Sequence, residues 1–284
     1  MEPNSEQPRF SIVTPSFKQS RYIEEALLSV KEQNYPRVQH IVVDGASTDG
    51  TVEILKRYAT TPGWEYLRWT SEPDRGQSDA LNKGVGMAQG DIIGWLNSDD
   101  RYRPACFREV AMAFERYPAV DILYGDYACI DENNRFTQVR REIEFSYFIL
   151  LYHRVLYIPS LATFFRRRIF DDGNFFDVRL ANDMDYEFFL RLAQKGYCFK
   201  HLPKLLADFR WHPESKSSTL SRPILQQHDL TAERYSPTLR KLPAGFPRKA
   251  VFLGLRALAA GLRYSEKLLR GYYFTQWKFI SRTS

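Results

Sequence analysis

The sequence has few cysteines and no long apolar run. Its three cysteines, Cys106, Cys129 and Cys198, are isolated and form no CxxC pair, which argues against a disulfide framework and fits a reducing cytosol. No stretch reaches the roughly 18–20 apolar residues that span a bilayer. The polar start at residues 1–9 is not followed by an apolar segment, so no signal peptide is expected. Together these absences predict a cytoplasmic protein.

Signals for nucleic-acid binding are also missing. The chain has no zinc-finger spacing, no RNP-type segment, no internal repeat and no low-complexity run. With 284 residues, 44% of them hydrophobic and 26% charged, it has the composition of an ordinary folded protein. The formal net charge of +6 suits anionic partners such as nucleotide diphosphates or an anionic membrane surface.

Apolar strands alternate with amphipathic helices in the first hundred residues. The periodicity predicts strands at 10–15, 40–43, 67–70 and 91–96, and helices at 24–33, 51–58 and 77–88. Continuous apolar strands between helices predict an α/β sheet with helices on both faces, which binds ligands beyond the carboxyl ends of its strands.

The pattern after Pro104 is less regular. It predicts a helix at 106–116, a strand at 121–127 and a helix at 185–195 with Phe188, Phe189, Leu192 and Ala193 inward. Residues 137–170 are aromatic and give no clear pattern. A polar loop is expected at 213–221.

Two adjacent carboxylates follow the fourth predicted strand, in the run Trp95-Leu96-Asn97-Ser98-Asp99-Asp100. Such a pair is electrostatically costly without a counter-ion, and Mg²⁺ or Mn²⁺ would supply one that also binds phosphates. The alternative is an exposed turn, where Asn, Ser and Asp are common.

Two further polar runs stand at predicted strand ends. Asp44 opens a turn, Asp44-Gly45-Ala46-Ser47-Thr48-Asp49-Gly50, in which we expect Asp44 to bind ligand and Asp49 to cap the next helix. The other run, Glu72-Pro73-Asp74-Arg75-Gly76-Gln77, leads into a helix whose start suits phosphate. Alone, it would equally fit a solvated loop.

Together with Thr14-Pro15-Ser16-Phe17, these runs occur in the order that is typical of family 2 glycosyltransferases, and the chain resembles that family from Phe10 to Ser218. The resemblance implies the GT-A fold, a mixed sheet flanked by helices. It implies an inverting transferase that takes a sugar from a metal-bound nucleotide-diphosphate donor, with UDP- or dTDP-sugars favoured. Within the family, the chain resembles the glycosyltransferases of bacterial surface-polysaccharide assembly.

By position, the resemblance assigns roles to single residues. It places Thr14, Pro15 and Ser16 near the nucleotide, Asp44 at the base, Arg75 and Asp79 near ribose and phosphates, and Asn97 and Ser98 at the donor sugar. Asp99 takes the metal-binding role of the DXD motif, with Asp100 beside it. Asn97 departs from the family, where an aspartate is frequent, and leaves the number of protein ligands to Mn²⁺ or Mg²⁺ open.

The segment Asn182-Asp183-Met184-Asp185-Tyr186-Glu187 resembles the acceptor-side motif of the family. Tyr186 fixes the register, so Asp185 matches the catalytic base and Asp183 is the fallback. The alternative is structural, with Asp183 capping a helix and Asp185 compensating its dipole.

A basic loop follows in Arg210-Trp211-His212-Pro213-Glu214-Ser215-Lys216. His212 would complete the metal shell and Lys216 would clamp the diphosphate. The other histidines, His40, His153, His201 and His228, share no spacing and are assigned no function.

We expect three parts: a flexible start at 1–9, a GT-A domain at 10–222 and a basic helical extension at 223–284. The domain divides into a nucleotide-sugar half, 10–104, and an acceptor half, 105–222. Two other functions stay open, a nucleotidyltransferase and a noncatalytic sugar-nucleotide or membrane-binding module. The first normally has a glycine-rich basic first loop, which is absent, and the intact Asp99, Asp100 and Asp185 argue against the second.

The extension interleaves basic and apolar residues between Arg248 and Arg270, with aromatic residues after it. A basic amphipathic helix of this kind suits a membrane interface, which would place the protein peripherally at the inner face of the plasma membrane with a lipid-linked saccharide as acceptor. The alternative is a helix packed on the domain with its basic face in solvent.

Overall fold

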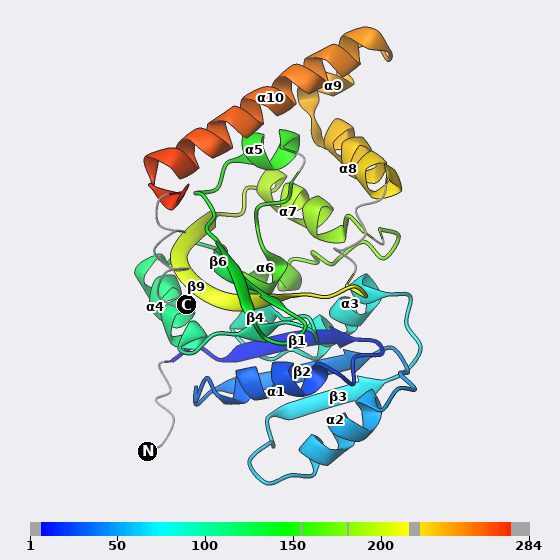
Figure 1. The fold of residues 1–284 in the computed structure, drawn as a ribbon, viewed down its shortest axis with the longest axis vertical. Helices are drawn as coiled ribbons and strands as arrows, with labels where there is room; N and C mark the ends of the chain where they lie inside the picture. The colour runs from blue at the N-terminus through cyan, green and yellow to red at the C-terminus, as the bar shows by residue number, and fades with distance from the viewer. Residues whose placement is uncertain (1–6, 154, 181, 216–221, 274–284) are drawn as a thin grey trace.

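One mixed β-sheet organises the chain. The computed structural model describes residues 7–153, 155–180, 182–215 and 222–273, and within them the sheet has nine strands in the order β3-β2-β1-β4-β8-β6-β9-β5, with β7 paired to β6 (Figure 1). The strands are β1 (Phe10–Ser16), β2 (Val38–Asp44), β3 (Leu67–Ser71), β4 (Ile92–Trp95), β5 (Arg101–Tyr102), β6 (Ile122–Asp131), β7 (Phe136–Arg140), β8 (Thr163–Arg166) and β9 (Phe199–Trp211).

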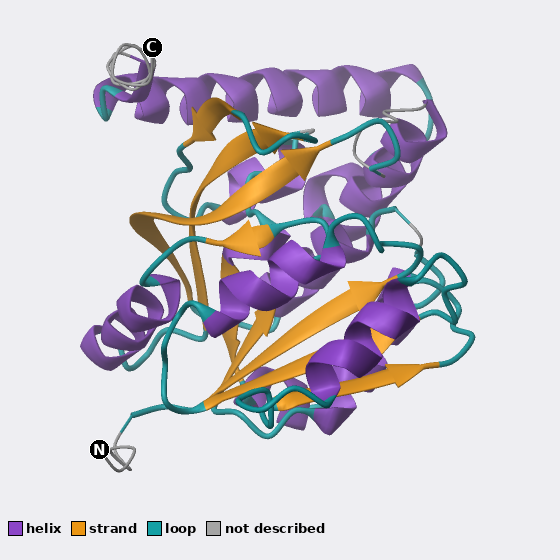
Figure 2. Ribbon diagram, turned by 60° about the horizontal axis from the view of Figure 1, so that its bottom comes forward, coloured by secondary structure: helices purple, strands orange, loops and turns teal. Residues whose placement is uncertain are grey.

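The first half of the sheet is parallel. Strands β3, β2, β1 and β4 run side by side, connected by α1 (Ile23–Lys31), α2 (Thr51–Ala59) and α3 (Gln77–Met87). All seven residues of β1 are buried, as its continuous apolar sequence predicts for a strand covered on both faces. Figure 2 shows helices on both sides of the strands. The strands and helices predicted for residues 10–96 are confirmed, with bounds shifted by one or two residues. Asp44 and Trp95 therefore end β2 and β4, the two strands that flank β1, at the same edge of the sheet.

The second half of the sheet is mainly antiparallel. Strand β8 pairs antiparallel with β4, and β6 pairs antiparallel with β8 and parallel with β9. Around it lie α4 (Cys106–Arg116), α5 (Tyr147–Tyr152), the short 3₁₀ helix η1 (Ser160–Ala162), α6 (Arg168–Asp171) and α7 (Met184–Gln194). No sequence pattern predicted β8, α5 or the 13-residue β9, which is a strongly curved strand of the sheet (Figure 1). Its uneven burial and its register shifts against β6 explain why no alternation is visible.

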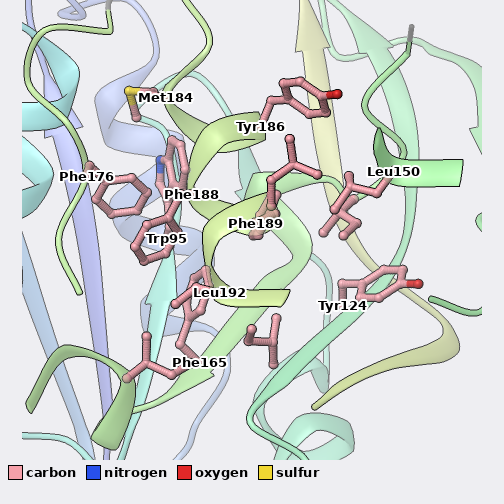
Figure 3. Packing of buried hydrophobic residues seen from close by; sticks show 14 of the residues in the cluster. Trp95, Tyr124, Leu150, Phe165, Phe176, Met184, Tyr186, Phe188, Phe189 and Leu192 are labelled. Atoms are coloured by element: carbon pink, nitrogen blue, oxygen red, sulfur yellow. The ribbon is translucent and has the colours of Figure 1, made fainter. Parts of the chain in front are cut away.

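Helix α7 packs its predicted apolar face into the largest core cluster. Phe188, Phe189 and Leu192 are fully buried, and Ala193 is half-buried. Figure 3 shows Phe188 beside Phe176, and the two ring centroids are 4.2 Å apart. The ring of Phe176 in turn meets Trp95 edge-on at 5.3 Å. These contacts hold the start of α7 against the end of β4, so the two halves of the domain meet there.

The C-terminal helices α8 (Arg222–Tyr235), α9 (Pro237–Arg240) and α10 (Phe246–Leu269) lie on the acceptor half (Figure 1). Helix α10 buries Phe252, Ala259 and Arg263. Arg263 and Lys267 both pair with the buried carboxylate of Glu142, at 2.7 and 3.1 Å. Helix α10 therefore packs on the domain, as one of the two alternatives predicted, but Arg263 and Lys267 face the domain and not the solvent. None of the helices in the described residues combines the length and apolar composition needed to cross a bilayer.

Two glycines of α3 provide a matched test of how closely this helix packs against β1. A Cβ at Gly84 would stand 2.4 Å from Cγ1 of Val13 on β1, whereas a Cβ at Gly86 would meet nothing within 4 Å. Gly84→Ala should therefore lower the free energy of unfolding by about 1–3 kcal/mol through overpacking. Gly86→Ala should raise it by about 0.5–1 kcal/mol through helix propensity. Urea denaturation measures both, and equal effects at the two positions would contradict this packing.

Candidate functional site

A pocket of about 970 Å³ opens where the carboxyl ends of β1 and β4 meet the starts of α3 and α7. Its wall includes Ser16, Asn97 and Asp99 from the nucleotide half and Asp183 and Asp185 from the acceptor half. Pro15 and Ser98 also line it. Residues that are almost 170 positions apart in the chain thus share one cavity, as expected for a sheet that binds ligands beyond its strand ends.

The end of β1 supplies two groups that suit a nucleotide. The hydroxyl of Ser16 is buried and has no hydrogen-bond partner among the described residues. The ring of Phe17, which follows it on the pocket wall, is 56% exposed. Such a ring can stack on a base, and the unpaired hydroxyl can hydrogen-bond a ligand. Phe17 ends the run Thr14-Pro15-Ser16-Phe17, but the sequence alone indicated no role for it.

Asp44 lies behind the pocket wall and not on it. Its fully buried carboxylate accepts hydrogen bonds from the amide and hydroxyl of Ser47, at 2.8 and 2.6 Å, and from the hydroxyl of Ser71, at 2.7 Å. Gly45, the next residue, does line the pocket. Asp44 therefore shapes the turn after β2, and its contact with a base stays a prediction. Thr14 is similarly buried, and its hydroxyl is 2.9 Å from Nε2 of His40.

In the turn before α3, the two residues predicted to bind the donor are also engaged within the protein. Arg75 and Asp79 pair with each other at 3.0 Å, and neither lines the pocket. The hydrogen bond from Arg75 lowers the pKa of Asp79. Their neighbours Asp74 and Gln77 form the wall instead. Asp74 and Gln77 belong to the polar run at residues 72–77, but nothing in its sequence distinguishes them from Arg75 and Asp79.

Asn97 holds the loop after β4. Its side-chain oxygen accepts hydrogen bonds from Gln77 Nε2 and Trp95 Nε1, both at 2.8 Å. Its amide nitrogen donates to Asp100 Oδ2 at 3.0 Å. The amide that replaces the family's aspartate is therefore engaged within the protein and ties together α3, β4 and the Asp99-Asp100 pair.

Asp100 is buried and fastens this loop to β9. Its Oδ1 accepts the backbone N–H of Arg210 at 3.0 Å, and burial together with the neighbouring Asp99 raises its pKa well above the usual range. The side chain of Arg210 is also buried and bonds the carbonyl of Asp99 at 2.9 Å and Glu25 at 2.7 Å. Sequence reasoning missed Arg210, although a basic residue two positions before His212 was visible.

Asp99 lines the pocket, and His212, which is buried and is not part of the wall, contacts it from behind. His212 Nε2 lies 3.0 Å from Asp99 Oδ2, and its ring packs on Tyr22 at 4.8 Å. The structure thus brings together the two residues predicted to hold a cation. Lys216, the predicted diphosphate clamp, lies outside the described residues.

These side chains fit a cation that is completed by the donor. Within the described ranges, no group of three or more His, Cys, Asp or Glu side chains forms a ready metal site. One carboxylate and one imidazole leave most coordination positions to phosphate oxygens and water, which is how Mg²⁺ and related ions are commonly bound with nucleotides. Asp99 keeps 20% of its side chain exposed, so it can reach such a ligand.

The acceptor end of the pocket contains both candidate bases. Asp185 accepts only the backbone N–H of Tyr186, at 2.8 Å, among the hydrogen bonds found in the described chain. Burial raises the pKa of Asp185 to about 6, and the nearby charge of Asp183 adds to this effect. Asp183 makes no capping hydrogen bond to α7, contrary to the structural alternative, and pairs instead with His228 at 2.9 Å.

The arrangement of sheet, strand-end loops and flanking helices is that of the GT-A fold, as predicted. S. aureus TarS (residues 1–349) in complex with UDP-GlcNAc aligns with a TM-score of 0.65 and 19% identity, over 89% of this chain and 71% of that chain. The mannosyltransferase PcManGT from Pyrobaculum calidifontis in complex with GDP-Man and Mn²⁺ aligns with a TM-score of 0.56 and 20% identity, over 97% of this chain and 86% of that chain.

Sequence comparison narrows this class to a family. The model of glycosyl transferase family 2 matches residues 11–173, and the chain belongs to that family. Glycosyltransferase Rv1514c of Mycobacterium tuberculosis is 33% identical over 188 residues, which are 66% of this chain and 69% of that protein. TuaG of Bacillus subtilis, described as a teichuronic acid biosynthesis glycosyltransferase, is 36% identical over 96 residues, which are 34% of this chain and 38% of that protein.

Asn97→Asp tests the role of the amide in the loop after β4. The change replaces the N–H that Asp100 accepts by a second carboxylate oxygen, so the free energy of unfolding at pH 7 should fall by about 1–3 kcal/mol. Urea denaturation without divalent metal measures the loss. Asn133→Asp, on an exposed turn, is the control and should change little. Equal stability of Asn97→Asp and the wild type would show that the amide does not hold this loop.

Proposed function

We propose that the protein is an inverting glycosyltransferase that moves a sugar from a nucleotide-diphosphate donor to an acceptor hydroxyl. One observation carries the proposal: Asp99, from the loop after β4, and Asp185, from the start of α7, line the same pocket. The donors bound by TarS and PcManGT, UDP-GlcNAc and GDP-Man, support a nucleotide sugar. The description of TuaG supports a role in bacterial surface-polysaccharide assembly.

In this proposal, residues at one end of the pocket bind the donor nucleotide, and residues at the other end deprotonate the acceptor. At the donor end, Phe17 stacks on the base and the Ser16 hydroxyl binds the nucleotide. At the acceptor end, Asp185 accepts the proton of the attacking hydroxyl. Attack from the face opposite the leaving nucleotide inverts the anomeric carbon without a covalent intermediate. The partly buried wall around Asp185 favours this chemistry, because it keeps the pKa of the carboxyl near the working pH.

Asp99 and His212 would hold Mn²⁺ or Mg²⁺, with Asp100 behind them. A bound cation supplies positive charge to the departing diphosphate. Asn97 and Asp100 keep Asp99 in place through the hydrogen bonds to α3 and β9. A nucleotidyltransferase remains a weaker alternative, because nothing in that reaction requires a carboxylate at the position of Asp185.

We also propose that α10 contacts the membrane through its outward face. Its exposed large apolar side chains are Phe246, Val251, Leu253, Leu258, Leu262, Tyr264, Leu268 and Leu269. Arg256 and Arg263 point to the opposite side, where they pair with Asp229 and Glu142. At 100° per residue, the apolar residues cover about half of the helix circumference, which is wider than the narrow seam of a two-helix dimer.

This geometry suits the surface of an anionic bilayer. A helix with a broad apolar face lies in the plane of the interface and buries that face among the acyl chains. The net charge of +6 favours a bilayer surface of opposite sign. A membrane-bound position would bring the pocket to a lipid-linked saccharide acceptor at the inner face of the plasma membrane.

Asp185→Asn and Asp99→Ala test the catalytic proposal by different readouts. Asp185→Asn should bind UDP with Mn²⁺ normally but lose about 10²–10⁴ in the rate of UDP-sugar turnover, because the general base is gone. The wild-type rate should rise as the pH passes about 6, where Asp185 ionises. Asp99→Ala should weaken Mn²⁺-dependent UDP binding by calorimetry about tenfold or more.

The surface variant Glu115→Gln is the control for both readouts and should match the wild type. Donors are screened as UDP-, dTDP- and GDP-sugars. Normal turnover by Asp185→Asn would refute the base assignment. Unchanged Mn²⁺-dependent binding by Asp99→Ala would remove the metal role.

Charged substitutions on the outward face of α10 test the membrane contact. The triple variant Leu253→Glu, Leu258→Glu and Leu262→Glu removes three exposed leucines and should reduce flotation with phosphatidylglycerol-containing vesicles about tenfold or more. Leu230→Glu, an equally exposed leucine on α8, is the matched control and should float as the wild type does. Unchanged flotation of the triple variant, or a loss of dimer mass in light scattering instead, would contradict the proposal.

A further inference from the structure

His228 stands at the acceptor end of the pocket, although it belongs to the C-terminal helix α8. Its ring stacks on Tyr186, with the ring centroids 3.7 Å apart and an interplanar angle of 14°. Its Nδ1 lies 2.9 Å from Asp183 Oδ1, and 11% of its side chain is exposed. Both His228 and Leu225 line the pocket, so α8 completes a wall that the sequence assigned to the domain alone.

Asp183 and Asp185 form a carboxylate pair beside His228. The two residues are separated by one position at the start of α7, and both line the pocket. Placing two negative charges together in a partly buried wall is unfavourable, so the two carboxyls compete for one proton. Which of them keeps it depends on the hydrogen bonds that each one receives.

The hydrogen bonds differ between the two carboxylates. Asp183 is only 2% exposed, and its Oδ2 has no partner in the part of the chain that the structure describes. The side-chain partner found among the described residues is His228 Nδ1, which donates the hydrogen bond when the carboxyl of Asp183 is ionised. Asp185 receives a backbone N–H and stays partly exposed to the pocket. The imidazole is thus the side chain that hydrogen-bonds Asp183 among the described residues, whereas Asp185 is bonded by the backbone.

We propose that His228 is a positioning residue of the acceptor site, whose Nδ1 hydrogen bond to Asp183 directs the proton shared by the two carboxyls to Asp185. The inference rests on the proposed function. It explains why the residue predicted as a fallback base is engaged elsewhere and why Asp185 is left to titrate. Glu187 and Tyr235, which also hydrogen-bond each other, hold α8 on α7 independently of His228.

The charged and titratable groups around His228 come from three helices. Asp183, Asp185 and Tyr186 face it from the start of α7. The ion pair between Arg256 of α10 and Asp229 of α8 also acts on this cluster. Because that ion pair is internally neutral, the imidazole is the group whose removal changes the balance between the two carboxyls most.

Two substitutions separate the hydrogen bond from the packing of the ring. His228→Phe keeps a ring to stack on Tyr186 but removes the donor. His228→Asn loses the ring but places an amide nitrogen at the δ position, where it can still donate to Asp183. Gln226→Ala, exposed on the same helix, is the control.

The first readout is the titration of the aspartate carboxyls, followed by NMR of ¹³C-labelled protein, with Asp185→Asn and Asp183→Asn used for assignment. In His228→Phe the last proton of the pair should leave about one pH unit higher than in the wild type. His228→Asn and Gln226→Ala should titrate like the wild type. This readout needs no turnover, so it stands even if no donor is found and the proposed function fails.

The second readout is the pH dependence of UDP-sugar turnover. The midpoint of the acidic limb of this pH–rate profile should move to a higher pH by a similar amount, and only in His228→Phe. Mn²⁺-dependent UDP binding should stay unchanged in all variants. A lower Tm in His228→Phe without any shift in titration or pH limb would show that His228 is merely a structural contact. An equal shift in His228→Phe and His228→Asn would also overturn the proposal, because the donor would then not be the cause.

Discussion

The buried carboxylate of Asp100 is the constraint on which the site depends. It accepts the amide of Asn97 and the backbone N–H of Arg210, and so joins the loop after β4 to the end of β9. Arg210 then holds the backbone of Asp99 and reaches α1 through Glu25. Because His212 follows two residues later on the same chain, this network also sets the distance between Asp99 and His212. The position of the candidate cation ligands is therefore decided largely by Asp100 and Arg210, which are buried and do not line the pocket.

Much of the nucleotide half could be predicted from the sequence. Its parallel strands are buried on both faces, so they appear as continuous apolar runs with polar motifs at their ends. The same reasoning placed Ser16, Asn97 and Asp99 at one edge, where the structure has them. It could not separate pocket residues from supporting ones. Asp44 and Asp74 both follow strands, but only the surrounding serines show that Asp44 is turned inward.

The acceptor half was harder to predict for a physical reason. Strand β9 is buried unevenly and changes register against β6, so it has neither the alternation of an exposed strand nor the continuity of a central one. Strand β8, which pairs with β4 and β6, is only four residues long. His228 was set aside because an isolated histidine on an amphipathic helix has no local signal. Only the packing of α8 on α7 brings it to Asp183.

Helices α8 and α10 are not separate from the GT-A domain. The boundary expected near residue 222 separates a domain from an extension, but α8 supplies part of the pocket wall. Arg256 ties α10 to Asp229 on that same helix. A displacement of α10 would therefore reach the pocket wall through this ion pair, in addition to the contacts of α10 with α5 and Glu142. The outermost helix of the chain and the wall of the buried pocket would then move together.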